Sequence, residues 1–204
     1  MKADHFEDLE QQAHAARLGM WIFLASEVLL FAALFGLFAA YRVEHHAAFD
    51  EAVHHNTKTH GSINTAVLLV SSALVALSVH AMRAGSRRAA CAFGGGTIAL
   101  GLVFLAIKLD EYRLHFAEGI YPGGSGAWFA THGKRGSAEF WTLYYGMTGV
   151  HAVHVILGIS VLSVLLLRAF RGRMPAPYPL ELGALYWHLV DTVWIFLWPL
   201  FYLA

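Results

Sequence analysis

Near its start the chain reads Gly19-Met-Trp-Ile-Phe-Leu-Ala-Ser-Glu27-Val-Leu-Leu-Phe31, which places one carboxyl group inside an apolar segment. Near its other end, Tyr186-Trp-His-Leu-Val-Asp191-Thr-Val-Trp194 does the same. A charged group at the middle of a bilayer costs about 2.5 kcal/mol or more, so it faces protein or water and pairs with another group. These segments predict a membrane protein in which Glu27 and Asp191 have specific roles.

The composition agrees with a membrane location. Hydrophobic residues make up 57% of the 204 residues, with a mean hydropathy of +0.52, whereas soluble domains have roughly 45–50% apolar residues. Five stretches have the roughly 20 apolar residues that a helix needs to cross a hydrocarbon core about 30 Å thick. They are residues 18–41, 62–82, 89–107, 140–167 and 182–203. The expected fold class is all-α, an integral membrane bundle of five transmembrane helices forming a single domain over residues 1–204.

Basic residues in the loops predict the orientation of the chain. Arginines gather at 83–88, after the second span, and at 168–173, after the fourth. Such clusters favour the cytoplasmic side of a membrane. The N-terminus is therefore expected in the cytoplasm and the C-terminus outside, with residues 119–136 in an outer loop.

Composition also excludes several kinds of function. Cys91 is the only cysteine, so a disulfide framework, a covalent haem attachment motif and an iron–sulfur site are not expected. The formal net charge is zero, which argues against nucleic acid as a partner because such binding needs a clustered basic face. We therefore expect no catalytic centre, no metal and no bound redox cofactor in this chain.

Histidine is abundant, with 13 residues, and two of them lie in the fourth span. His151 and His154 are three residues apart, which places them on one side of a helix. Haem or copper could bind such a pair, but the spacing favours a polar pair that joins helices or holds a lipid head group. The histidines between the spans are expected to be solvated surface residues. They are His45, His46, His54, His55, His60 and His132.

The two buried acids have different sequence surroundings. His188 lies one turn before Asp191, so the two side chains are predicted to form a structural polar pair. Glu27 has only apolar residues one turn away on either side, so its partner must come from another helix, a lipid or water. A role in proton or lipid binding and a purely structural hydrogen bond both remain open for Glu27.

Five motifs in order resemble the subunit III family of haem-copper terminal oxidases, from Gly19 through Leu203. Ser26-Glu27-Val28 resembles the family's Ser-Glu-Val motif with its carbodiimide-reactive glutamate. The other four segments lie in the later spans. They are Asn64-Thr65, Glu111-Tyr112, His151-Ala-Val-His154 and Trp187-His188-Leu-Val-Asp191-Thr-Val-Trp194. Long members have seven spans, so this chain resembles a short, five-helix form that begins at their third.

The resemblance implies a non-catalytic subunit of a proton-pumping cytochrome c oxidase in the aerobic respiratory chain of a bacterial cell membrane. Its partners would be catalytic subunit I and subunit II, which would hold the haem and copper, together with membrane lipids. Its role would be to support complex stability, proton uptake and oxygen access. The residues implied in proton or lipid binding are Glu27, Glu111, His151 and His154. Phospholipid is a candidate ligand.

Three alternatives stay open at this point. The chain could be subunit III of a bo-type quinol oxidase, or a homologue associated with nitric-oxide reductase. A small proton-coupled transporter is an alternative of a different class, because Glu27, His151 and Asp191 form an ionisable set within the membrane. Transporters often show internal repeats and broken helices, and neither is visible in this sequence.

Overall fold

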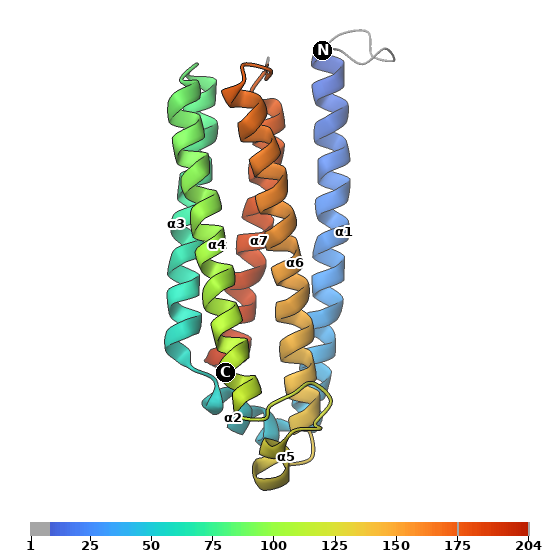
Figure 1. Ribbon diagram of the computed structural model, residues 1–204. Helices are drawn as coiled ribbons and strands as arrows, with labels where there is room; N and C mark the ends of the chain where they lie inside the picture. Colours follow the sequence, from blue (N-terminus) through green and yellow to red (C-terminus); the bar gives the residue numbers. More distant parts are fainter. Residues whose placement is uncertain (1–8, 175, 204) are drawn as a thin grey trace.

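The structure is a computed structural model that describes residues 9–174 and 176–203. Within these residues there are seven helices and no strand. Five helices are long and apolar enough to span a membrane, which confirms the predicted all-α fold class (Figure 1). They are α1 (Leu9–Glu44), α3 (Lys58–Arg83), α4 (Arg87–Ala117), α6 (Ser137–Phe170) and α7 (Tyr178–Tyr202). The helices extend beyond the predicted spans, since hydropathy marks only their apolar middle.

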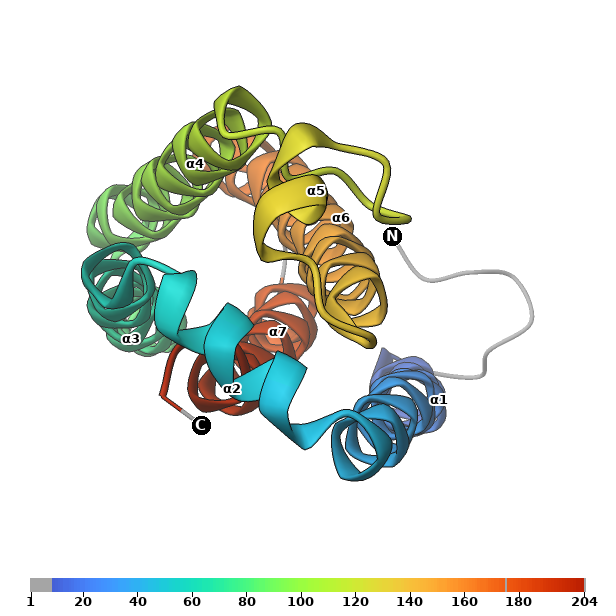
Figure 2. The ribbon, with the colours of Figure 1, turned by 90° about the horizontal axis from the view of Figure 1, so that it is seen from below.

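Two short helices lie outside the predicted spans, at the end of the bundle where α7 ends (Figure 1). Helix α2 (His46–His55) runs across that end, below α7 and between α1 and α3, and α5 (Ala127–His132) lies beside α6 (Figure 2). Four apolar side chains of α2 are buried: Ala48, Phe49, Ala52 and Val53. This amphipathic helix therefore closes one end of the bundle, where the sequence suggested only a loop rich in histidine.

Helices α3, α4, α6 and α7 pack together, and α1 lies beside α6 and α7 (Figures 1 and 2). The buried apolar residues of α1 are Leu24, Phe31 and Phe38, each seven residues from the next. Such a spacing returns to the same face of a helix every two turns. The most deeply buried apolar side chains of helix α1 therefore form one narrow seam against the other helices, while side chains such as Leu29 are exposed.

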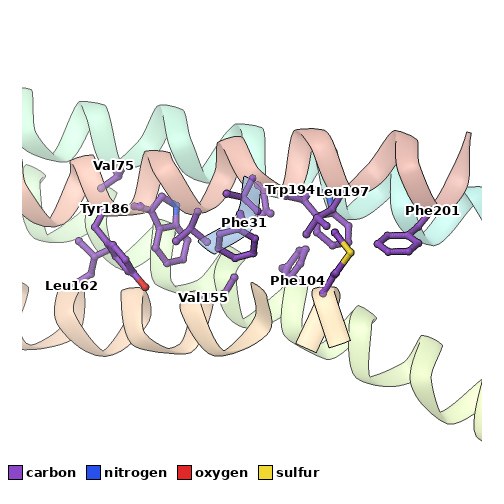
Figure 3. Close-up of a cluster of buried hydrophobic side chains, with 14 of the residues drawn as sticks. Phe31, Val75, Phe104, Val155, Leu162, Tyr186, Trp194, Leu197 and Phe201 are labelled. Carbon is purple, nitrogen blue, oxygen red and sulfur yellow. The ribbon is translucent and has the colours of Figure 1, made fainter. Parts of the chain in front are cut away.

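Two tryptophans of α7 form successive layers of the core. Trp187 lies against Gly101 of α4 and Gly158 of α6, where an added Cβ would come within 2.7 and 2.8 Å of the indole, respectively. One heptad later, the Trp194 ring meets Phe104 edge to face with centroids 4.8 Å apart (Figure 3). The indole nitrogens donate to α3, Trp187 to Ser71 Oγ at 3.0 Å and Trp194 to Thr65 Oγ1 at 3.1 Å. The same side chains therefore fill the core and satisfy hydroxyl groups within it.

Candidate functional site

Glu27 and His154 join α1 to α6. The Glu27 Oε2 atom lies 2.7 Å from His154 Nε2, and the two side chains are 17% and 12% exposed. Of the three sources that the sequence left open for the partner of Glu27, this contact shows another helix. His154 Nδ1 lies 2.8 Å from the Val150 carbonyl oxygen, which can only accept, so Nδ1 carries a hydrogen. The bond to Glu27 then holds one further proton, either on the imidazole or on the carboxyl group.

Lys108 and Glu111 of α4 lie at the centre of a buried polar network. Lys108 Nζ donates to Glu111 Oε2 at 3.1 Å and to the hydroxyls of Tyr144 and Tyr202 at 2.8 and 2.7 Å. Both tyrosine hydroxyls donate to Glu111 Oε1 at 2.7 Å. All three ammonium hydrogens are therefore used, and both carboxylate oxygens accept. The network joins α4, α6 and α7.

The predicted pair of His188 and Asp191 is wrong. His188 Nδ1 lies 2.7 Å from Ser72 Oγ of α3. Neither carboxyl oxygen of Asp191 forms a hydrogen bond within the described residues. Spacing along α7 permits the pair, but it does not account for α3, whose Ser72 hydroxyl lies next to the imidazole. Asp191 instead occupies the core, where it is 4% exposed.

His151 and His154 do not act as a pair. His154 faces α1, whereas His151 points into the core, where its ring lies 5.3 Å from the Trp194 ring and 5.5 Å from the Phe104 ring. Neither ring nitrogen of His151 has a hydrogen-bond partner among the described residues. Residues three apart differ by about 60° around a helix, so neighbouring helices can separate them. The expected polar link between helices is therefore made by His154 alone.

Comparison with known proteins identifies the family. A sequence profile described as cytochrome c oxidase subunit III matches residues 5–204. The chain belongs to this family. It is 31% identical over 202 residues to quinol oxidase subunit 3 of Bacillus spizizenii, covering 96% of this chain and 91% of that protein. It is also 31% identical to cytochrome c oxidase subunit 3 of Alkalihalophilus pseudofirmus, covering 91% and 85%.

A third relative is a fusion, the haem-copper oxidase subunit I+III of Aeropyrum pernix, which is 30% identical over 92% of this chain and 22% of that protein. Subunit III of haem-copper oxidases is part of a multi-subunit complex, and the fused relative is consistent with a partnership with subunit I. The five apolar helices and the bacterial oxidase relatives support a multi-pass membrane protein. The names of the relatives include both cytochrome c and quinol oxidases.

A cavity of about 910 Å³ opens between α1, α6 and α7 of this subunit III, at the end that holds the α6–α7 turn. Its walls include apolar side chains such as Met20, Phe23 and Leu157. Three arginines line it as well: Arg17, Arg168 and Arg173. A cleft with apolar walls and charged residues, which include Glu10 and Glu181 as well as the arginines, suits an amphiphile.

The histidines at the opposite end are only partly solvated. His46 and His132 are exposed as expected. His55 Nε2 lies 2.7 Å from Glu118 Oε2, and its ring packs 5.5 Å from that of Trp128. The side chain of His45 is 9% exposed. The prediction that these histidines are solvated is therefore wrong for His45 and only partly right for His55, because α2 packs against the end of the bundle and holds both side chains there.

Sequence reasoning missed the partners of the buried polar groups. The signal for Lys108 was present, since a lysine three residues before a glutamate in an apolar span is expected to pair with it. Tyr144, Tyr202 and Ser72 carried no such signal, because a tyrosine or serine in a membrane helix is common. Within the described residues, no group of three or more His, Cys, Asp or Glu side chains is arranged to hold a metal ion.

Proposed function

We propose that this chain is the non-catalytic subunit III of a proton-pumping cytochrome c oxidase in the respiratory chain of a bacterial cell membrane. Family membership over residues 5–204 supports an oxidase subunit, and the Glu27–His154 pair is the observation that carries the link to protons. In this proposal, subunits I and II hold the haem and copper. The subunit supports the stability of the complex, its proton uptake and the access of oxygen.

The Glu27–His154 bond supports this role because it retains a proton at the junction of α1 with the other helices. A proton shared by a carboxyl and an imidazole can be exchanged without breaking the contact. Helix α1 is also held by its narrow seam of Leu24, Phe31 and Phe38 and by the ion pair of Arg17 with Glu181. The pair thus links the attachment of α1 to the protonation of Glu27.

The cavity between α1, α6 and α7 supports phospholipid as a ligand. Arginines attract a phosphate group by charge and by paired hydrogen bonds, and the apolar walls suit an acyl chain. Glu181 contacts Arg17 at 3.5 Å and therefore holds this arginine near the cavity. It also contacts Arg83 at 2.8 Å. Lipid extraction of the purified complex carrying Arg168→Gln tests this ligand, with loss of one tightly held anionic lipid as the expected result.

The first test isolates the chain with its partners from its native membrane in mild detergent. A reduced-minus-oxidised spectrum and oxygen consumption with cytochrome c and with quinol are then measured. Haem bands with cytochrome c oxidation support the proposal. Activity with quinol alone supports the competing assignment, subunit III of a bo-type quinol oxidase; the Bacillus relative is named as a quinol oxidase subunit 3. A colourless protein without partners would contradict both and favour the transporter.

The second test addresses Glu27. Glu27→Ala is expected to leave assembly intact and to shorten the period over which the oxidase sustains turnover, since the shared proton is lost. Asp110→Asn is the matched control, because Asp110 is an exposed carboxyl on α4. Proton uptake and turnover lifetime equal to those of the control would remove Glu27 from the proposed role.

A further inference from the structure

Asp191 is a buried carboxyl group without a partner. It lies on α7 between Trp187 and Trp194, the two indoles that form successive core layers. It is 4% exposed, and neither of its oxygens has a hydrogen bond within the described residues. A buried, unpaired carboxylate costs far more than the neutral acid, because ionised groups lose much more hydration energy on burial. The position therefore suits a carboxyl group that holds a proton.

No neighbouring cation bonds Asp191 in the described structure. Helix α3 contributes the hydroxyls of Ser71 and Ser72, and α6 contributes His151, whose ring lies against Trp194. Lys108 of α4 reaches the Trp194 ring at 5.6 Å, but its three hydrogens are bound to Glu111, Tyr144 and Tyr202. From α1, Glu27 is bound to His154. His188 of α7 lies one turn before Asp191 and forms no hydrogen bond to it within the described residues.

His188, one turn before Asp191 on α7, lines a groove of about 330 Å³ between α3 and α7. It is lined by polar and titratable side chains, namely His80, Arg83, Glu181 and His188, together with small and apolar residues. His188 Nδ1 lies 2.7 Å from Ser72 Oγ. The Ser72 hydroxyl also interacts with the Asp191 carboxyl, although the contact falls outside hydrogen-bond geometry. A serine hydroxyl both donates and accepts, so a small movement of the Ser72 side chain toward Asp191 connects the imidazole with the acid.

We propose that Asp191 is a proton-binding site that exchanges its proton with water in the α3–α7 groove through His188 and Ser72. On loading, water gives a proton to His188 Nε2, the Nδ1 hydrogen passes to Ser72 Oγ, and the serine hydroxyl hydrogen passes to Asp191. Each intermediate group receives one proton and gives up another. The hydroxide left in the groove is neutralised by bulk solvent, and no electron is transferred. Release follows the reverse order.

The test is infrared spectroscopy of the complete oxidase complex that carries this chain, in H2O and in D2O. The wild type is compared with Asp191→Asn, which keeps the shape of the side chain. The wild type is expected to show one carbonyl band of a protonated carboxyl that the variant lacks and that shifts in D2O. Ser72→Ala is expected to slow this shift about tenfold, which corresponds to about 1.4 kcal/mol in the barrier.

Ser163→Ala is the matched control, since Ser163 is an exposed serine on α6 whose hydroxyl donates to Ile159 O at 2.7 Å. If Asp191→Asn instead loses the bands of an ionised carboxylate and no carbonyl band of a protonated acid, Asp191 is ionised in the wild type. That result would overturn the proposal. Exchange at the wild-type rate in both Ser72→Ala and His188→Phe would overturn the route. Should Asp191→Asn fail to assemble, Asp191→Glu retains the acid, and an unmoved carbonyl band would overturn the assignment. These readouts need no turnover, so they are independent of the proposed oxidase function.

Discussion

Lys108 and Asp191 carry ionisable groups in the same four-helix bundle, but their surroundings differ. Around Lys108, one carboxylate and two tyrosine hydroxyls use every hydrogen of the ammonium group. Around Asp191, indole rings and one serine leave both carboxyl oxygens without a bond. Burial alone therefore does not define a role: a satisfied network holds helices together, whereas an unsatisfied acid remains free to bind a proton.

The two surroundings predict different losses of stability on substitution. Breaking a buried ion pair leaves a charge without compensation, which costs about 3–5 kcal/mol. Replacing a polar group that has no partner removes no bond and costs little. Substitutions in the two regions should therefore change stability by very different amounts, and this contrast can be measured.

The largest effect is expected for Lys108→Met. The methionine fills a similar volume but leaves Glu111 buried without its cation, so the free energy of unfolding should fall by about 3–5 kcal/mol. Thermal stability and yield of the assembled complex measure this loss. The double variant Lys108→Met with Glu111→Leu should recover most of it, because no charge then remains. A single variant as stable as the wild type would show that the network does not secure the helices.

A smaller loss is expected for Tyr202→Phe, which removes one donor to Glu111 and one acceptor for Lys108. Hydrogen bonds between membrane helices contribute about 0.6 kcal/mol on average and up to about 1.7 kcal/mol. Because the acceptor here is charged, we expect about 1.5 kcal/mol, at the upper end of that range. Tyr121→Phe is the control, since Tyr121 is 41% exposed. Equal thermal stability of the two variants would contradict the argument.

Ser72→Ala should have a still smaller effect on stability, about 0.6 kcal/mol, because it removes a single neutral hydrogen bond to His188. Chemical denaturation of the purified complex measures it, with Ser163→Ala as the control. A loss as large as that of Lys108→Met would show that Ser72 holds helices together as the Lys108 network does. It would weaken the contrast between the two regions.

The same contrast explains what could be predicted from the sequence. The five spans follow from apolar length, a property of each segment by itself, and they were predicted correctly. For Glu27, the lack of a local partner left another helix, a lipid or water as candidates, and the structure shows His154 of another helix. The prediction for His188 and Asp191 was wrong, because helical spacing allows a local pair whereas His188 contacts Ser72, 116 residues away.

Contacts between helices set the rest. Tyr144 and Tyr202 lie 36 and 94 residues from Lys108, and spacing within one helix carries no information about them. Helix α2 was missed for another reason: its 10 residues bury only a few apolar side chains, so their pattern is too short to stand out from a polar loop. The residues that join distant helices are therefore the ones that only the packed structure identifies.

The smallest effect, with the opposite sign expected, is that of Asn64→Leu. Asn64 is fully buried in α3, and neither atom of its amide has a hydrogen-bond partner among the described residues. Leucine has the same branching and number of side-chain heavy atoms and no polar group to desolvate, so the complex should be unchanged or more stable by up to about 0.5 kcal/mol. Thermal unfolding measured beside Tyr202→Phe tests this. A clear loss of stability would show that Asn64 is bonded in the assembled complex and belongs with the satisfied network.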